Sequence, residues 1–211
     1  SKKYLELCIT SGKFTNTLGE VDVKDGESDG ALFRKIRETY KETRKSLLPT
    51  GYIFRKPVAA IFVKVSLSVA SKPRCSYKAP SIPPKEQVDN GQYEYRPCPI
   101  DAPPMTSNWF MHHFDFIDDP RHPEEIWGPR LPKKLGISLA ASTELLAQGW
   151  GIRIEEGPNW ALLSILMFLF ILISGIVAGA YAVKTHDNQA AVAIGTWLTT
   201  VQAMGMAALF F

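Results

Sequence analysis

The sequence predicts an α+β domain followed by a two-helix transmembrane hairpin. Residues 160–181 contain no charged side chain, and a second uncharged run covers residues 190–211. A helix rises about 1.5 Å per residue, so about 20 apolar residues cross a hydrocarbon core of about 30 Å. Before residue 158 the apolar residues instead recur with strand and helix periods in turn. We therefore divide the chain into a domain at residues 1–158 and a hairpin at residues 159–211.

The two predicted spans lie at about residues 160–183 and 190–211. The polar break at residues 184–189 is short, so the second span must return antiparallel to the first. The second span is the weaker prediction because it contains Thr196, Thr199, Thr200 and Gln202.

The domain is expected to begin with a β-hairpin. Leu5, Leu7 and Ile9 alternate with other residues over 4–9, which is the pattern of a half-buried strand. Residues 18–23 predict a second short strand after a turn.

A helix is expected from about Ala31 to about Leu47, with Ser28 or Asp29 as its N-cap. Its apolar stripe consists of Leu32, Phe33, Ile36 and Tyr40, and its cations are Arg34, Lys35, Arg37, Lys41, Arg44 and Lys45. We interpret these cations as a solvated face, interleaved with acidic residues. Contact with anionic lipid headgroups is the alternative.

Three later segments complete the predicted domain. Residues 58–69 alternate as a strand, and residues 109–117 predict another, with Phe110, Phe114 and Phe116 on one face. Residues 137–148 have helical character. Residues 149–156 form a last strand that leads through Gly157 and Pro158 into the first span. This order is compatible with a β-grasp arrangement, although other mixed or antiparallel α+β sheets with one main helix fit it as well.

Residues 72–105 are rich in proline, which breaks helices and strand ladders. The segment is either a flexible linker or an extended wrap over the domain. Tyr77, Tyr93 and Tyr95 favour the wrap, because disordered linkers are poor in aromatic residues.

Composition limits the function only weakly. The net charge of +3 is spread along the chain, which argues against a nucleic-acid partner. Cys8, Cys75 and Cys98 cannot all pair with one another and show no CxxC spacing. We therefore expect reduced thiols in a cytosolic domain.

Several segments resemble a large, uncharacterised family of filamentous-fungal membrane proteins. They are residues 33–40, 62–65, 93–99, 132–135, 149–152 and 156–160, ahead of two membrane helices. The resemblance implies a fungal source and a soluble domain fused to a C-terminal hairpin. It implies no activity and no catalytic residue.

One cluster of ionisable residues raises the question of chemistry. It contains His112, His113, Asp115, Asp118, Asp119, His122, Glu124 and Glu125. A strand would place His113 and Asp115 on the same side, where they could ligate zinc or iron. No HExxH or other metal signature is present, and the GxSxG, P-loop and GxGxxG motifs are absent. We expect a solvated acidic loop, with no catalytic residue, cofactor or metal.

The predicted spans carry small and polar residues suited to helix packing. Gly175 and Gly179 form a GxxxG motif, and Ala191 with Gly195 offers a small surface on the second span. Thr199 and Gln202 lie at membrane depth, where such groups normally face protein. Packing within the hairpin and packing between subunits both remain open.

We expect a membrane-anchored, non-enzymatic interaction or complex-subunit protein whose domain faces the cytosol. Its expected partners are the lipid bilayer and either another protein or a second copy, with no nucleic acid. A self-associating channel or membrane-permeabilising effector is the first alternative. An integral-membrane enzyme acting on lipid is the second.

Overall fold

The computed structural model describes residues 2–10, 16–47, 54–68, 74–78, 81–96, 105–117, 126–142 and 146–208. The chain forms two compact units, Ser1–Gly157 and Pro158–Phe211, which we describe separately.

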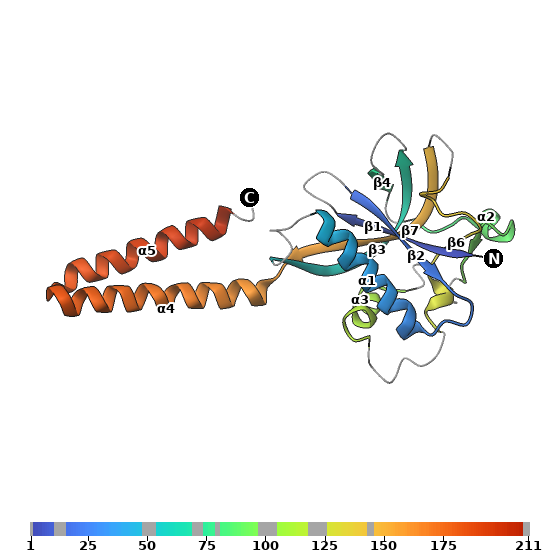
Figure 1. The fold of residues 1–211 in the computed structure, drawn as a ribbon. Helices are drawn as coiled ribbons and strands as arrows, with labels where there is room; N and C mark the ends of the chain where they lie inside the picture. The colour runs from blue at the N-terminus through green and yellow to red at the C-terminus, as the bar shows by residue number, and fades with distance from the viewer. Residues whose placement is uncertain are drawn as a thin grey trace. The chain divides into compact units, whose positions relative to one another are not determined.

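The first unit is built on one mixed β-sheet (Figure 1). Its strands are β1 (Lys3–Thr10), β2 (Asn16–Val23), β3 (Arg55–Ser68), β4 (Arg74–Lys78), β5 (Tyr93–Glu94), β6 (Lys133–Leu135) and β7 (Leu146–Pro158). Its helices are α1 (Asp29–Leu47), α2 (Lys85–Asp89) and α3 (Ser107–Asp115), with a 3₁₀ turn, η1, at Gly128–Arg130.

The strands lie in the order β2-β4-β3-β7-β1-β6-β5. β7 runs parallel to β1 and lies between it and β3, while β1 pairs antiparallel with β2 along its whole length. β2 also pairs with β4, through Thr17 and Arg74, so the sheet curls back on itself. The right-handed twist of strands favours such curling. β1 consequently has neighbours along both edges.

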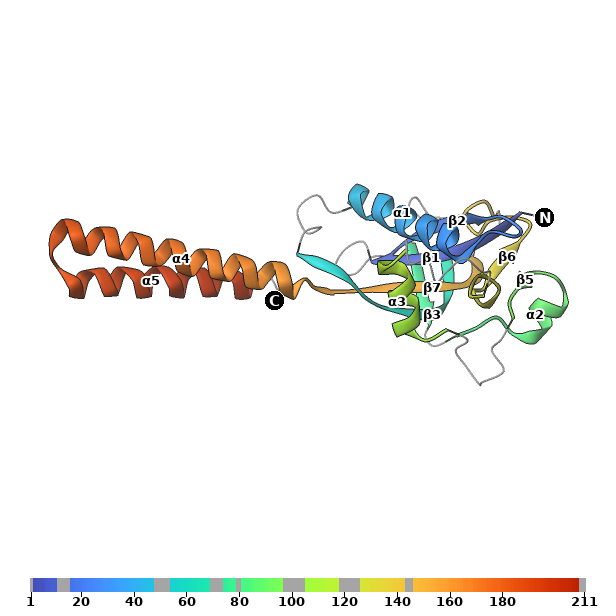
Figure 2. The same ribbon diagram turned by 90° about the horizontal axis from the view of Figure 1, so that it is seen from below.

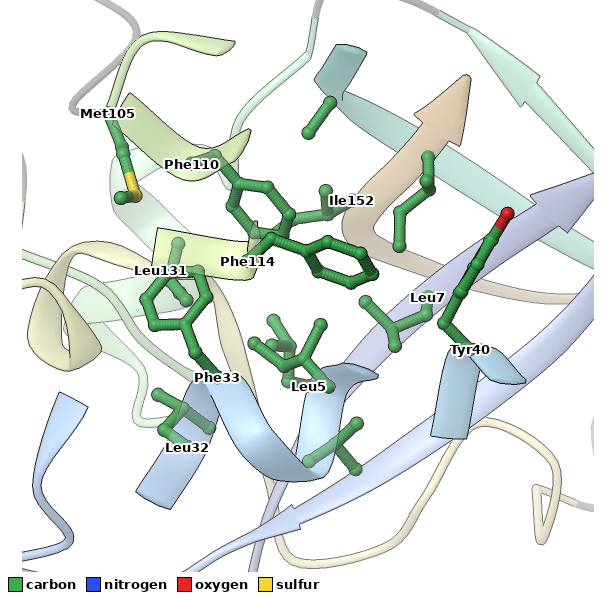
Figure 3. Close-up of a cluster of buried hydrophobic side chains, with 14 of the residues drawn as sticks. Leu5, Leu7, Leu32, Phe33, Tyr40, Met105, Phe110, Phe114, Leu131 and Ile152 are labelled. Atoms are coloured by element: carbon green, nitrogen blue, oxygen red, sulfur yellow. The ribbon is translucent and has the colours of Figure 1, made fainter. Parts of the chain in front are cut away.

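The main core lies between the sheet and the helices α1 and α3, which pack on the same side (Figure 2). Leu5, Leu7 and Ile9 of β1 face this core, as the alternation predicts. Phe33 of α1 meets Phe110 of α3 edge to face, with ring centroids 5.2 Å apart. Figure 3 shows side chains of this core, among them Leu5, Phe33 and Phe110, gathered between the two helices and the strands.

A second buried cluster occupies the other face of the sheet. It contains Cys8, Val63, Val65, Leu67, Leu139 and Ala147. Because β1 is buried on both faces, it is not the half-buried strand that its alternation predicts. Glu6, which shares the second face with Cys8, is completely buried.

Two predicted elements are wrong in the described residues. Residues 109–117 are not a strand, because Ser107–Asp115 form the helix α3, whose first turn is capped by the Thr106 hydroxyl. Residues 137–142 contain no helix, and β7 already begins at Leu146.

The proline-rich segment holds β4, α2 and β5, and Tyr93 and Tyr95 within it are buried. Residues 97–104 of that segment lie outside the described part.

A buried ion pair joins α1 to the end of β7. Arg44 Nε lies 2.8 Å from Glu156 Oε1, and the hydroxyl of Tyr40 donates a hydrogen bond of 2.6 Å to the same oxygen. Arg44 also donates to the carbonyl of Arg55 at the start of β3, at 2.9 Å. Three elements are therefore held together by one guanidinium group.

The second unit is a pair of packed helices, α4 (Trp160–Thr185) and α5 (Asn188–Ala208). His186 ends α4 in the left-handed conformation, with φ of 55°, and the Asp187 carboxylate accepts from the Ala190 amide near the start of α5. Among the described residues, α4 is the one helix that is long and apolar enough to cross a membrane. α5 is less apolar because of its threonine and glutamine residues.

Replacing Arg44 by alanine is expected to lower the free energy of unfolding by about 3–5 kcal/mol, because it leaves the Glu156 carboxylate buried without its cation. Lys41→Ala, at an exposed position on the same helix, is the control and is expected to change it by about 0.5 kcal/mol or less. Denaturant unfolding of the full chain in detergent measures both. Equal effects of the two substitutions would contradict the role of the pair.

Candidate interaction surface

Helix α3 presents one face to the core and another to solvent. Phe110, His113 and Phe114 are buried, and Phe114 meets Tyr40 of α1 with ring centroids 5.6 Å apart. On the other face Trp109 is 53% exposed. Tryptophan is one of the residue types enriched at protein interfaces.

Trp109 belongs to a group of aromatic and apolar side chains that we call the aromatic surface. It consists of Trp109, His112, Phe116, Ile126 and Trp127. The rings of Trp109 and Trp127 stack with centroids 6.1 Å apart, and those of His112 and Phe116 lie 5.2 Å apart. Phe116 is 60% exposed and Ile126 45%. The rings of Trp109, His112, Phe116 and Trp127 thus form a connected series, and Ile126 precedes Trp127 in the chain.

A cation borders this surface. The guanidinium carbon of Arg130 lies 4.9 Å from the centroid of the Trp127 ring, in cation–π contact. Tryptophan and arginine are the residue types most enriched at the energetic centres of protein interfaces.

The carboxylate of Asp29 fixes this surface to the start of α1. Its oxygens accept hydrogen bonds from the amides of Ile126, Trp127 and Gly128, at 3.0, 2.8 and 2.7 Å. Ser28 caps the helix instead, because its hydroxyl accepts from the amide of Ala31 at 3.4 Å. Asp29 is therefore available to hold a segment nearly one hundred residues away in the sequence.

The proposed metal ligands do not come together in the described residues. Helix α3 places His113 in the core beside Phe33 and leaves Asp115 exposed, so the two do not share a side. No group of three His, Cys, Asp or Glu side chains that could hold a metal occurs in the part of the chain that the structure describes. Asp118, Asp119, His122, Glu124 and Glu125 lie outside that part.

The predicted cations of α1 have different surroundings. Arg34 and Lys41 are exposed, and Arg37 is partly exposed. Lys35 pairs with Glu27 at 2.7 Å. Arg44 departs from the predicted basic face, because it is buried in the ion pair with Glu156. The side chain of Lys45 lies outside the described part.

The small residues of the hairpin divide into two groups. Gly195 and Ala191 lie where the helices approach: a Cβ on Gly195 would stand 3.2 Å from the Cβ of Ala178, and Ala191 is buried. A Cβ on Gly175 or Gly179 would meet no atom within 4 Å in the described structure. The GxxxG motif is thus open in a single chain.

Hydroxyl groups line the space beside this motif. A hollow of about 440 Å³ between α4 and α5 is bordered by Ser174, Gly175, Gly195, Thr196 and Thr199. The Ser174 hydroxyl donates to the Gln202 side-chain oxygen at 3.1 Å. The Thr199 hydroxyl donates to the carbonyl of Gly195 in its own helix.

Sequence reasoning did not identify the buried carboxyl of Glu6. It lies opposite Glu20 in the β1–β2 register and accepts a hydrogen bond from the Leu139 amide at 3.2 Å. The Glu20 carboxylate accepts from the next amide, that of Ala140, at 2.7 Å. Burial raises the pKa of Glu6 to about 8, and the negative charge of Glu20 adds to this rise.

Two glycines of β7 allow this packing. A side chain on Gly151 would collide with the backbone of Glu6, and one on Gly149 would stand 2.7 Å from the Tyr93 hydroxyl. That hydroxyl accepts from the amide of Trp150 at 3.1 Å. The glycines of residues 149–151 therefore serve close strand packing.

Comparison with known proteins gives no relative: no family model, no curated protein and no solved structure matches the chain. The resemblance to a fungal membrane-protein family therefore stays a prediction.

Glu6→Gln is expected to remove a loss of stability that occurs as the pH rises from about 4.5 to about 8. Between the unfolded pKa of 4.5 and the native pKa of about 8, native Glu6 keeps a proton that the unfolded chain releases. The free energy of unfolding therefore falls as pH rises through this window, by up to about 1.4 kcal/mol per pH unit. Glutamine cannot ionise, so the fall should diminish.

The measurement is denaturant unfolding of the full chain from about pH 5 to about pH 9. Glu38→Gln, an exposed position on α1, is the control and should keep the wild-type pH dependence. The same pH dependence in both variants would mean that Glu6 is ionised in the folded domain at neutral pH.

Proposed function

We propose that the chain is a membrane-anchored, non-enzymatic interaction protein whose domain binds another protein through the aromatic surface. The observation that carries the proposal is the exposure of Trp109, Phe116 and Ile126 on a folded domain joined directly to an apolar helix. Exposed aromatic groups of this kind are characteristic of binding sites.

The proposal of a membrane anchor is based on the surface of α4. Its apolar side chains are largely exposed, including Phe168 at 61% and Ile176 at 70%. Exposed apolar area costs about 25 cal/mol per Å² in water, and a bilayer removes that cost. We propose that α5 returns through the same membrane, since it follows α4 after two residues and packs against it.

A β-grasp-like topology is part of the proposal. A β-hairpin, β1–β2, precedes α1, and the last strand enters the sheet beside β1 and parallel to it. α1 packs across the same sheet. We propose that this domain lies in the cytosol, since three cysteines without a CxxC spacing are typical of reduced thiols.

The proposed occupant of the aromatic surface is a protein, because the surface lies away from the point where the chain leaves the domain. Asp29 holds the surface at the first residue of α1, whereas β7 leaves the domain beside Arg44. Fifteen helical residues separate these points, which corresponds to about 22 Å. The proposed partner presents an apolar segment to this surface.

Truncating the aromatic surface is expected to abolish partner binding. The double variant Trp109→Ala with Ile126→Ala removes two of its exposed apolar side chains, and the loss of one interface hot spot weakens binding by about 30-fold or more. Ile137→Ala is the matched control, because Ile137 is 64% exposed elsewhere on the domain.

The assay is photo-crosslinking of the full chain in native membranes, from a photoreactive residue at position 109 or at position 137. One identified protein should be captured from position 109 and not from position 137, and the double variant should lose that protein on co-purification. Recovery of a bare monomer, or equal capture from both positions, would overturn the proposal.

A second candidate function, self-association into a channel, is favoured by the open GxxxG motif and by the hollow beside it, whose lining includes the hydroxyl groups of Ser174, Thr196 and Thr199. The occupant in this case is α4 of a second copy, since Gly175 and Gly179 leave room for a closely approaching backbone.

Gly175→Ile with Gly179→Ile is expected to abolish both the oligomer and dye release from liposomes if this second function holds. Gly205→Ile is the control, because a side chain at Gly205 also meets open space but lies outside the motif. Chemical crosslinking in liposomes and fluorescence of an enclosed dye give the two readouts. Absence of dye release by the wild-type chain would exclude a pore.

A further inference from the structure

The end of the domain that leads into α4 is defined by covalent geometry. β7 ends at Pro158 and α4 begins at Trp160. An extended residue spans at most about 3.6 Å, so Gly157 is at most about 11 Å of chain from the first residue of α4. If α4 spans the bilayer, the residues around Gly157 lie at the level of the lipid headgroups.

Three elements of the domain meet at this end. A side chain built on Gly157 would stand 2.9 Å from a methyl group of Val58, so the start of β3 lies against the end of β7. The guanidinium of Arg44 joins the carboxylate of Glu156 to the carbonyl of Arg55. The start of β3 is therefore held beside Gly157 by packing and by hydrogen bonds.

Among the described residues, the exposed charge at this end is positive and comes from β3. On α1 the exposed cations Arg34 and Lys41 are interleaved with the exposed carboxylates of Glu38 and Glu42. Glu156 is neutralised by Arg44, and Glu155 pairs with Arg153 at 3.3 Å. Arg55 and Lys56 are both exposed and add two positive charges.

Val58 adds an apolar side chain next to these cations. Its side chain is 49% exposed. Val58 lies in β3, between the buried core residues of that strand and the end of the domain that leads into α4. Cations that flank an exposed apolar side chain match the headgroup region, where phosphates lie above the acyl chains.

We propose that Arg55 and Lys56 bind anionic lipid headgroups and that Val58 inserts into the interface beside them. This inference rests on the proposed function, since it requires that α4 anchors the chain. It differs from the contact predicted for the α1 cations, which are interleaved with Glu38 and Glu42. The lipid contact holds the domain in one orientation on the membrane.

The test captures the lipids that touch position 58. The full chain carries a photoreactive benzoylphenylalanine at this position and is reconstituted in nanodiscs of phosphatidylcholine mixed with phosphatidylserine. Mass spectrometry of the adducts gives the ratio of the two lipids. Arg55 and Lys56 are expected to enrich phosphatidylserine among the adducts relative to its share of the nanodisc lipids. The enrichment should be at most about 30-fold at low salt.

The variant Arg55→Gln with Lys56→Gln should return the adducts to the composition of the disc, and high salt should act in the same direction. Lys24→Gln with Lys85→Gln is the matched control: both lysines are exposed, and Lys24 follows the end of β2 that pairs with the start of β1. This control should keep the enrichment. Adducts of unbiased composition in the wild type, or adducts to protein only, would overturn the inference.

Extraction of the membranes with alkaline carbonate distinguishes the absence of a lipid preference at position 58 from the absence of a membrane anchor. A chain that is released by carbonate contradicts the proposed function itself. A chain that stays in the membrane but shows no lipid preference contradicts only the role of Arg55 and Lys56.

Discussion

The buried carboxylate of Glu156 is the constraint on which the domain's connection to α4 depends. An ion buried without partners costs several kcal/mol, and here Arg44 and Tyr40 both bind one oxygen of the carboxylate. The same guanidinium binds the Arg55 carbonyl, so α1, β3 and β7 are fixed to one another at a single point. β7 lies between β1 and β3, and this point therefore fixes the strand that leads into α4.

Periodicity predicted the elements whose burial follows their apolar pattern. β1, the long strand β3, helix α1 and β7 all show it, because their apolar residues recur at the strand or helix period. For residues 109–117 the strand period gave a wrong prediction, because Ser107–Asp115 form the helix α3. Phe110, Phe114 and Phe116 suggested a strand, but Phe110, His113 and Phe114 follow the spacing of a helix, and Thr106 supplies the N-cap. The strand spacing and the helix spacing were both present in the sequence. The helix spacing was harder to recognise because one of its buried positions is a histidine, His113.

The interactions that assemble the candidate surface could not be predicted, because they join residues far apart in the chain. Asp29 looked like a helix cap, and only the fold brings the amides of residues 126–128 to its carboxylate. Arg44 was expected on a solvated face, and the half-buried strand predicted for residues 4–9 would leave Glu6 on its exposed side. The curl of the sheet and the segment around Leu139 bury Glu6, while Glu156 draws Arg44 inward.

Helix α1 links the two proposed surfaces through its ends. Asp29 at its first residue holds the segment that carries Trp127, and Arg44 near its last turn holds the start of β3. A helix is stiff over this length, so the distance of about 22 Å between the two points is fixed by the rise per residue. A protein bound at the aromatic surface would consequently be held about that far from the Arg55 end. Because both connections use buried side chains of one helix, a change in α1 would alter partner binding and lipid contact together.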